Sequence, residues 1–453
     1  MDANYSRQHE IFVTGHNGTS LAEVTALTAI GPLSILLRNL AIPWVFPARN
    51  FARGGICDKW LKFLLDFCLS VLPTILCYSY MCDAVTSAVV IQCLCSMSLL
   101  VFAICEYFYL YRDKPILKDV LNSSSCIDSR TKPFFITYFR AYTLIATSVA
   151  ILGVDFPVFP RRFAKTESYG YGLMDTGVGI FVLTNALTAP ELKKPRIRVS
   201  KMILSSVPLV VLGLLRLAVV KLSGYHEHIS EYGLHWNFFF TLATVKIFSA
   251  LLSSALPLSR LAGLLSVAVS VGYQYLLSRH GLASVLLWGS TNSATREGIF
   301  DANREGLISV IGYFALYLAG LRLGSWFQKP RVKLKDWICL LGQLSACTLL
   351  FVSLLLASEC FVDLPSRRMA NLPRLHVRSA GTVPLGADQP KGLGPLPPSQ
   401  FADWCREFRN SDTRNPGRFG NGPFGLPFGH PICHRLFPIE IVFISELCKV
   451  RDW

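Results

Sequence analysis

Residues 86–110 read TSAVVIQCLCSMSLLVFAICEYFYL, and Glu106 is the one charged side chain among them. A helix needs about 20 mostly apolar residues to cross roughly 30 Å of hydrocarbon. This stretch is therefore long enough to span a bilayer, and similar runs recur along the first four-fifths of the chain. We predict an all-α fold, a polytopic helical bundle integral to a membrane.

Polar or Gly/Pro-containing stretches separate the apolar runs. The predicted spans lie at 21–45, 61–81, 86–110, 134–154, 172–190, 202–220, 236–256, 261–278, 307–325 and 337–357. A further apolar stretch, 282–288, is too short to cross, and we expect it to be re-entrant or packed on the bundle. The chain thus divides into an N-terminal segment at 1–20, a transmembrane domain at 21–372 and a tail at 373–453.

The composition agrees with this class of protein. Of the 453 residues, 52% are hydrophobic and 16% are charged, whereas about a quarter of an ordinary soluble domain is charged. The net charge of +15 is spread over loops between apolar runs, so we expect membrane lipid and no nucleic acid as a partner. The fourteen cysteines lack paired CxxC spacing, and we expect them to be small buried side chains.

Lysine and arginine accumulate in alternate loops, most densely at 112–132, 193–201 and 329–335. Such loops remain in the cytosol. The intervening loops hold fewer basic residues and share the lumenal side with the N-terminus. This alternation runs through all the predicted spans without a violation.

The densest group of ionisable residues is DFPVFPRRFAKTE at 155–167. Pro157 and Pro160 forbid a continuous helix, so the chain turns at the membrane surface and can bring Asp155 and Lys165 together. A carboxylate and an ammonium in a partly desolvated turn can serve as general base and oxyanion stabiliser in acyl transfer. A purely structural ion pair is the alternative.

Ionisable side chains inside spans are costly and usually face a partner or a polar cavity. This chain has Arg38, Asp66, Arg140, Asp175, Arg216 and Lys246 in such places. Basic residues outnumber acidic ones, so we expect Arg140 and Arg216 to bind a phosphate of a lipid or of coenzyme A. Snorkelling or internal pairing is the alternative.

A second polar group, YHEHISEYGLHWN at 225–237, contains three histidines and two glutamates. No pair has the HExxH spacing of a helical zinc site, so we expect no metal. His235 is better suited to shuttle a proton or to bind a polyol, because its unperturbed pKa lies near neutrality.

The segment DFPVFPRRFAKTESYGYGLMDTGVGIFV at 155–182 closely resembles the hallmark segment of the family of GPI-anchored wall transfer protein and phosphatidylinositol-glycan class W. Four further blocks resemble the family in the same order. They are GHNGTSLAEV at 15–24, HEHISEYGLHWNFFFTL at 226–242, NREGLISVIGY at 303–313 and PSRRMANLP at 365–373. By the charge bias all five lie at the lumenal face, so we predict one site there.

The resemblance implies transfer of a long-chain acyl group to the inositol ring of glucosaminyl-phosphatidylinositol in GPI-anchor biosynthesis. The donor would be acyl-CoA, a co-substrate, with no further cofactor, in a multi-pass protein of the endoplasmic reticulum membrane. Asp155 and Lys165 would be the reacting pair. Substrate contacts are expected from Arg161, Arg162, Asp175, His235 and Asn237. The other motif residues are Asn17, Glu23, Asn303, Glu305, Arg367, Arg368 and Asn371.

The chain departs from the family after Pro373, where members continue into further spans. Residues 373–453 are rich in Gly and Pro and have neither helical nor strand period. We expect this tail to be disordered. A shifted reading frame or a misjudged intron would account for it, and a genuine replacement is the alternative.

Two rival functions fit a polytopic bundle with charges in its spans. A secondary transporter has this signature too, but it should show paired halves, and no internal repeat of the 155–167 type occurs. A non-catalytic membrane subunit of GPI assembly is the other alternative.

The orientation predicts opposite fates for two glycosylation sequons. Asn17-Gly18-Thr19 is lumenal, whereas Asn122-Ser123-Ser124 lies in a basic cytosolic loop. We expect a glycan at Asn17 alone, and its closeness to the first span can block even that. Mobility after endoglycosidase treatment of each Asn→Gln variant tests this, and a glycan on Asn122 would reverse the topology.

Overall fold

The computed structural model describes residues 16, 18–45, 56–110, 134–166, 170–192, 199–223, 229–289, 296, 298–329, 331 and 334–361. All of them belong to the compact unit Met1–Val377. The second unit, Arg378–Trp453, lies outside the described residues. So do the motif block at 365–373 and the whole of the predicted tail.

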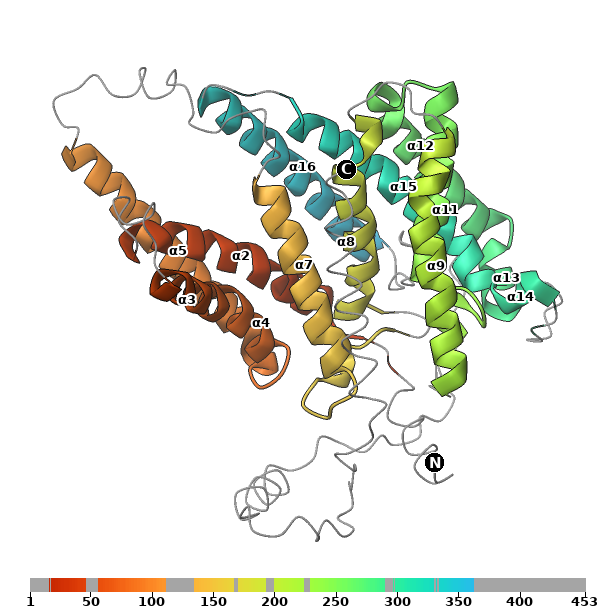
Figure 1. Ribbon diagram of the computed structural model, residues 1–453, viewed down its shortest axis with the longest axis horizontal. Helices are drawn as coiled ribbons and strands as arrows, with labels where there is room; N and C mark the ends of the chain where they lie inside the picture. Colours follow the sequence, from red (N-terminus) through yellow and green to blue (C-terminus); the bar gives the residue numbers. More distant parts are fainter. Residues whose placement is uncertain are drawn as a thin grey trace, which may run out of the picture. The chain divides into compact units, whose positions relative to one another are not determined.

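The described residues are helical, as predicted, and their one β-type contact is an isolated antiparallel bridge between Thr19 and Tyr171. The longer helices are α2 (Leu21–Val45), α5 (Val85–Leu110), α7 (Phe134–Gly153), α8 (Leu173–Leu187), α9 (Val199–Ser223), α11 (Phe238–Ala255), α12 (Leu258–Arg279), α15 (Arg304–Phe327) and α16 (Leu334–Phe361) (Figure 1). One further pass is composite and consists of α3 (Ile56–Asp66), the π-helical turn η1 (Phe67–Val71) and α4 (Leu72–Cys77).

Short helical turns connect these helices. They are η2 (Cys82–Ala84), η3 (Arg161–Phe163), η4 (Pro190–Leu192), α10 (Ile229–Tyr232), α13 (Leu282–Trp288) and α14 (Gly298–Ala302). As expected for the apolar stretch 282–288, α13 does not cross and packs on α12 and α15.

Nine helices in the described part of the chain are long and apolar enough to cross a membrane, and they match nine of the ten predicted spans. The prediction at 172–190 is wrong in length. Helix α8 has 15 residues and measures about 22 Å, short of roughly 30 Å of hydrocarbon. It ends where Pro190 follows, and its buried Val182 and Ala186 show why a short helix suffices, because the protein rather than lipid surrounds it.

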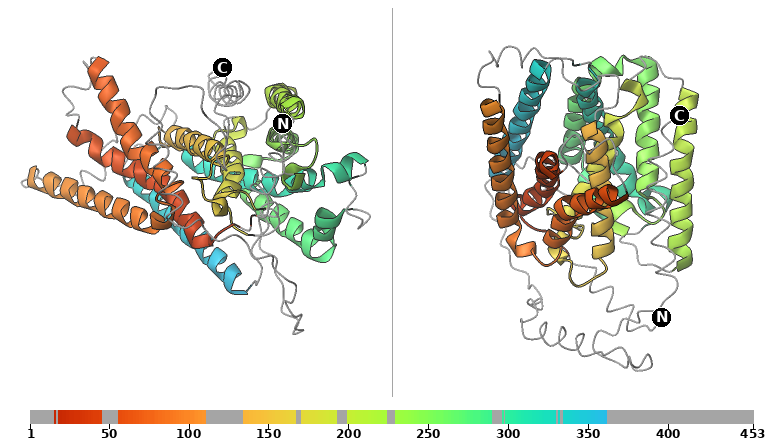
Figure 2. Two further views of the ribbon diagram at one scale, coloured as in Figure 1. Left: turned by 90° about the horizontal axis from the view of Figure 1, so that it is seen from below. Right: turned by 60° about the vertical axis from the view of Figure 1, so that its left-hand side comes forward.

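Helix α15 is the centre of the larger helix group. It packs against α8, α11 and α12, and 61% of its most apolar window is buried. Gly320 allows the close approach, because a Cβ there would lie 2.6 Å from the Cβ of Ala186. Small residues are favoured at such interfaces in membranes. Helices α9 and α11 also pack together, and the right-hand view of Figure 2 shows them side by side in yellow-green and green.

The outer helices expose their apolar side chains. Only 11% of the α5 window and 6% of the α16 window are buried in protein, which is expected for surfaces solvated by lipid. The expectation that the cysteines are buried is wrong for several of them. Cys77 is buried, but the outward faces of the spans carry exposed thiols at Cys68, Cys95, Cys105 and Cys339. An apolar residue in a span can face lipid as well as a core.

An ion pair inside the bundle joins α2 to the composite pass. Arg38 Nε and Nη2 donate to the two carboxylate oxygens of Asp66 at 2.7 and 3.2 Å, and Nη1 donates to the hydroxyl of Tyr138 at 3.4 Å. The π-helical turn begins directly after Asp66. The alternative of internal pairing therefore holds for Arg38 and Asp66.

This pair predicts a coupled effect on stability. We expect Arg38→Leu to lower the free energy of unfolding by about 1 to 3 kcal/mol, because it leaves the carboxylate of Asp66, whose side chain is 40% exposed, without its cation. The double variant Arg38→Leu/Asp66→Leu removes both charges and should regain most of the loss. Thermal midpoints in detergent measure both. Equal midpoints for the single and double variants would contradict the coupling.

Candidate functional site

The site begins with the turn between α7 and α8, and Arg161 holds this turn in shape. Its Nη2 donates to the carbonyl oxygens of Val154 at 2.6 Å, Phe156 at 3.3 Å and Phe159 at 3.2 Å. These carbonyls lie in or directly before the stretch where Pro157 and Pro160 have no backbone N–H to donate, and that of Phe156 also accepts from Phe159 N at 3.2 Å. Burial lowers the pKa of Arg161 to about 10, partly opposed by the charge of Asp155, so the guanidinium remains charged at neutral pH.

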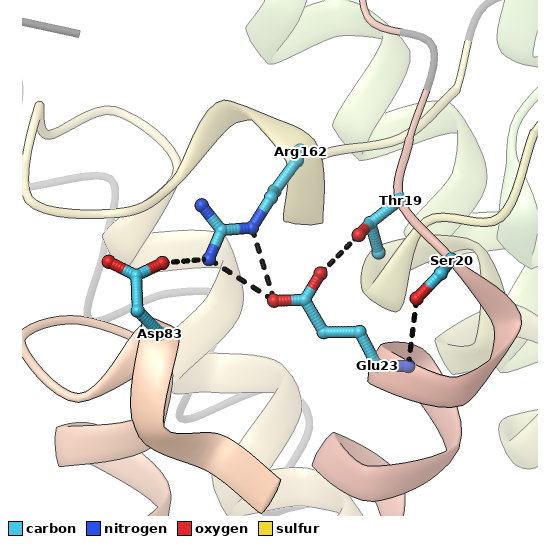
Figure 3. A network of polar contacts seen from close by, with 5 residues as sticks. All are labelled: Thr19, Ser20, Glu23, Asp83 and Arg162. Carbon is cyan, nitrogen blue, oxygen red and sulfur yellow. Dashed lines mark hydrogen bonds and ion pairs between the residues drawn. The ribbon is translucent and has the colours of Figure 1, made fainter.

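Arg162 connects this turn to two other parts of the chain. Its Nε donates to Glu23 Oε1 at 3.1 Å, and its Nη2 donates to Asp83 Oδ1 at 2.6 Å (Figure 3). Burial lowers the pKa of Arg162, but the hydrogen bond to Asp83 and the charge of Glu23 outweigh it and raise the pKa overall. One guanidinium thus joins α2, the turn η2 and the α7–α8 turn.

Glu23 is itself oriented by the start of α2. Its backbone N–H donates to Ser20 Oγ at 3.2 Å, and its Oε2 accepts a short hydrogen bond from the hydroxyl of Thr19. Serine followed by glutamate three residues later is the pattern of a capping box at a helix N-terminus. The carboxylate that binds Arg162 therefore extends from a capped helix end (Figure 3).

The segment before α2 also bonds to the far end of the turn. Thr19 N donates to the carbonyl of Tyr171 at 2.7 Å. Gly18 has φ +76°, and a Cβ there would lie 2.4 Å from that same carbonyl oxygen. Glycine is required here both for the left-handed backbone and for the close approach.

Asp175, in the first turn of α8, closes the loop on itself. Its Oδ2 accepts from Thr166 N at 3.1 Å and from Thr166 Oγ1 at 2.9 Å. Gly172 lies beside this carboxylate, because a Cβ there would come within 2.6 Å of Asp175 Oδ2. Thr166, the residue after Lys165, is thereby held against the first turn of α8.

Lys165 connects the loop to a third block. Its Nζ lies 2.5 Å from Glu231 Oε2 and 5.9 Å from the centre of the Tyr232 ring. Asp155 is partly exposed at the start of the turn, and its charge acts on Arg161. The ion-pair partner of Lys165 in the described chain is therefore Glu231. The reacting roles of Asp155 and Lys165 stay predictions.

The third and fourth blocks meet at Asn303. Its Oδ1 accepts from the backbone N–H groups of His235 at 2.8 Å and Trp236 at 3.0 Å. Asn237 is buried and caps α11, with Oδ1 accepting from the N–H groups of residues 239 and 240. The buried carboxylate of Glu305 forms a bidentate ion pair with Arg296 at 2.8 and 3.2 Å.

Four of the five motif blocks therefore meet at one end of the bundle, as predicted. The predicted site residues brought together there are Glu23, Asp155, Arg161, Arg162, Lys165, Asp175, His235, Asn237, Asn303 and Glu305. Arg140 and Arg216 lie partly buried within α7 and α9, at about 20 and 10 Å from the ends nearest the site. The others, Asn17, Arg367, Arg368 and Asn371, lie outside the described residues.

The sequence did not single out several residues of this network. Glu231 stands in the quoted 225–237 stretch, but nothing there distinguishes it from Glu227 as the partner of Lys165. Asp83 lies outside every motif block. Thr166 and Tyr171 lie inside the central block, but they are uncharged, and the prediction there rests on the charged residues.

Comparison with known proteins identifies the family to which the sequence belongs. The sequence profile of the GWT1 family matches residues 5–380. The chain belongs to the GWT1 family. That match includes all of the described residues and ends soon after Pro373, where the sequence changes character.

Curated relatives cover most of the chain. The chain is 37% identical over 376 residues to glucosaminyl-phosphatidylinositol-acyltransferase PIGW of Bos taurus, with 80% of the chain and 72% of the relative covered. The protein of that name from Homo sapiens is 37% identical over 383 residues, with the same coverage. GPI-anchored wall transfer protein 1 of Aspergillus fumigatus is 32% identical over 408 residues, with 82% and 78% covered.

The bridge between Thr19 and Tyr171 predicts a sharp effect of one methyl group. We expect Gly18→Ala to lower the thermal midpoint in detergent, because the backbone is strained by about 1 kcal/mol and the new Cβ collides with the Tyr171 carbonyl. Gly177→Ala in α8 is the matched control, since nothing lies within 4 Å of its Cβ. Equal midpoints for the two variants would contradict the bridge.

Proposed function

We propose that the chain transfers a long-chain acyl group from acyl-CoA to the inositol ring of glucosaminyl-phosphatidylinositol. The observation that carries the proposal is the meeting of four separated motif blocks around the turn that holds Lys165. Membership of the GWT1 family supports it, as do relatives named for acyl transfer to glucosaminyl-phosphatidylinositol.

The chemistry needs a base and a cation near the reacting atoms. Asp155 would take the proton of the inositol hydroxyl while the oxygen of that hydroxyl attacks the thioester carbon. Lys165 would stabilise the negative charge that develops on the carbonyl oxygen. The new C–O ester bond forms as the C–S bond breaks, and the thiolate of coenzyme A takes up a proton.

The other residues would hold the two substrates. Arg140 lies in a span away from the turn, whereas Arg216 lies within one helical turn of Gly213, whose carbonyl accepts from Asn237. Both are suited to a phosphate of either substrate, because a guanidinium in hydrocarbon favours an anion. His235 is exposed beside the turn and would bind inositol hydroxyls. Arg162 would keep its bonds to Glu23 and Asp83 and would form the edge of the site next to α2 and η2.

The proposed function also predicts the membrane in which the protein acts and the side on which its site lies. A multi-pass protein acting in GPI-anchor biosynthesis is expected in the endoplasmic reticulum membrane. The charge bias of the loops supports a lumenal N-terminus and a lumenal site. Acyl-CoA made in the cytosol would then have to reach the site through the bundle.

The catalytic roles predict loss of turnover without loss of protein. We expect Asp155→Asn and Lys165→Ala each to lower inositol acylation in microsomes by at least about 100-fold, because each removes a group that acts in the transition state. Protein level and thermal midpoint should stay near wild type.

Lys335→Ala and Asp336→Asn are matched controls, since both side chains are exposed on α16. They should acylate normally. Acylation by both site variants at the wild-type rate would refute the assignment, and loss of activity that follows loss of protein would make Asp155 and Lys165 structural.

A further inference from the structure

The ammonium of Lys165 is held on two sides by one short helix. Glu231 Oε2 lies 2.5 Å from Nζ, and the Tyr232 ring lies 5.9 Å from it. The side chains of Lys165 and Glu231 are 28% and 18% exposed, so water screens this pair less than a surface pair. The direction of the ammonium therefore depends on where α10 lies.

Helix α10 is tied down directly after Tyr232. Gly233 has φ +98°, and a Cβ there would lie 2.3 Å from the carbonyl oxygen of Ala302. Leu234 N donates to that same carbonyl at 2.8 Å. Only glycine combines this backbone conformation with so close an approach, so the chain leaves α10 pressed against the residue before Asn303.

The next residues fix the segment to two long helices. Asn303 accepts from the N–H groups of His235 and Trp236, and the indole of Trp236 lies over Gly306 of α15, where a Cβ would come within 2.3 Å. Asn237 Nδ2 donates to the carbonyl of Gly213 in α9 at 2.9 Å. Glu231 is thus presented by backbone anchored to the rigid part of the bundle.

A lysine needs such an anchor if its ammonium is to act at a fixed point. Its four-carbon stem is flexible and its charge attracts water, whereas oxyanion stabilisation requires a donor about 3 Å from the developing charge. The carboxylate of Glu231 accepts one of the three N–H donors and leaves two for another acceptor.

We propose that Glu231 is a positioning residue for acyl transfer, which fixes the ammonium of Lys165 in the direction where the oxyanion forms. This inference rests on the proposed function. Glu231 itself forms no bond to the reacting atoms. Its removal should therefore lower kcat more than it raises KM for either substrate.

The first test compares Glu231→Gln and Glu231→Asp with wild type in the microsomal assay. We expect Glu231→Gln to lower kcat by about 10- to 100-fold, the effect of misplacing a catalytic group by about 1 Å. Glu231→Asp keeps the charge and should recover part of the rate. A kcat within twofold of wild type for Glu231→Gln would overturn the proposal.

The second test exchanges the two charges. Lys165→Glu/Glu231→Lys keeps an ion pair between the loop and α10 but moves the ammonium to the other side of it. The pairing predicts a folded protein with a near wild-type thermal midpoint, whereas kcat should stay low because Lys165 itself has been replaced. A midpoint as low as that of the less stable single variant would show that the two side chains do not pair and would overturn the proposal.

A third measurement does not depend on turnover. In native membranes, mass spectrometry can quantify how fast a lysine-acylating reagent modifies Lys165. We expect severalfold faster modification in Glu231→Gln, because the carboxylate no longer holds the amine, and unchanged modification of Lys335. Equal rates at Lys165 would disprove the pairing. Wild-type protein that shows this pairing but no transfer would refute the proposed function instead.

Discussion

Hydrocarbon offers the backbone no hydrogen-bond partner, and this constraint determines where this protein can carry irregular structure. Inside the spans the chain is helical, and the described irregular segments lie at helix ends. There Pro157 and Pro160 lack the backbone N–H that a continuing helix would use. Arg161 donates to three carbonyls of the turn after α7, and the carbonyl of Phe156 also accepts from Phe159 N at 3.2 Å. The conformation that presents Asp155 and Lys165 therefore depends on side-chain bonds as well as backbone bonds.

The arginine beside it has a different task. Arg161 bonds within its own turn, whereas Arg162 reaches residues 139 and 79 positions away in sequence. Arg161 therefore stabilises the conformation of the turn, and Arg162 fixes the turn to distant parts of the chain. Similarly, Asp175 secures Thr166 within the loop, while Lys165 reaches a helix 66 positions further on. Local contacts shape the turn, and distant ones place it.

The sequence predicted the helices well because the length of an apolar run is a direct measure of whether it can cross hydrocarbon. The prediction failed at α8, where burial within protein removes the need for full length. It also failed for exposed cysteines such as Cys95, because periodicity is weak when lipid and core are both apolar. Convergence of the motifs followed from the alternation of the loops. The ion pair of Lys165 with Glu231 did not, since the position of Glu231 depends on the left-handed glycine at 233 and its contact with Ala302, which no charge pattern reveals.

The dependence of the third block on Asn303 has a consequence for biosynthesis. A membrane protein is synthesised from its N-terminus, and α2 to α11 are complete before residue 303 exists. Until that asparagine has been made, the N–H groups of His235 and Trp236 lack the acceptor that holds them in the finished protein. The earlier helices can insert one by one. The site next to α2 cannot be completed until the residues at the start of α15 have been synthesised. Maturation of the site is therefore a late, post-insertion event, although most of its charged residues are translated early.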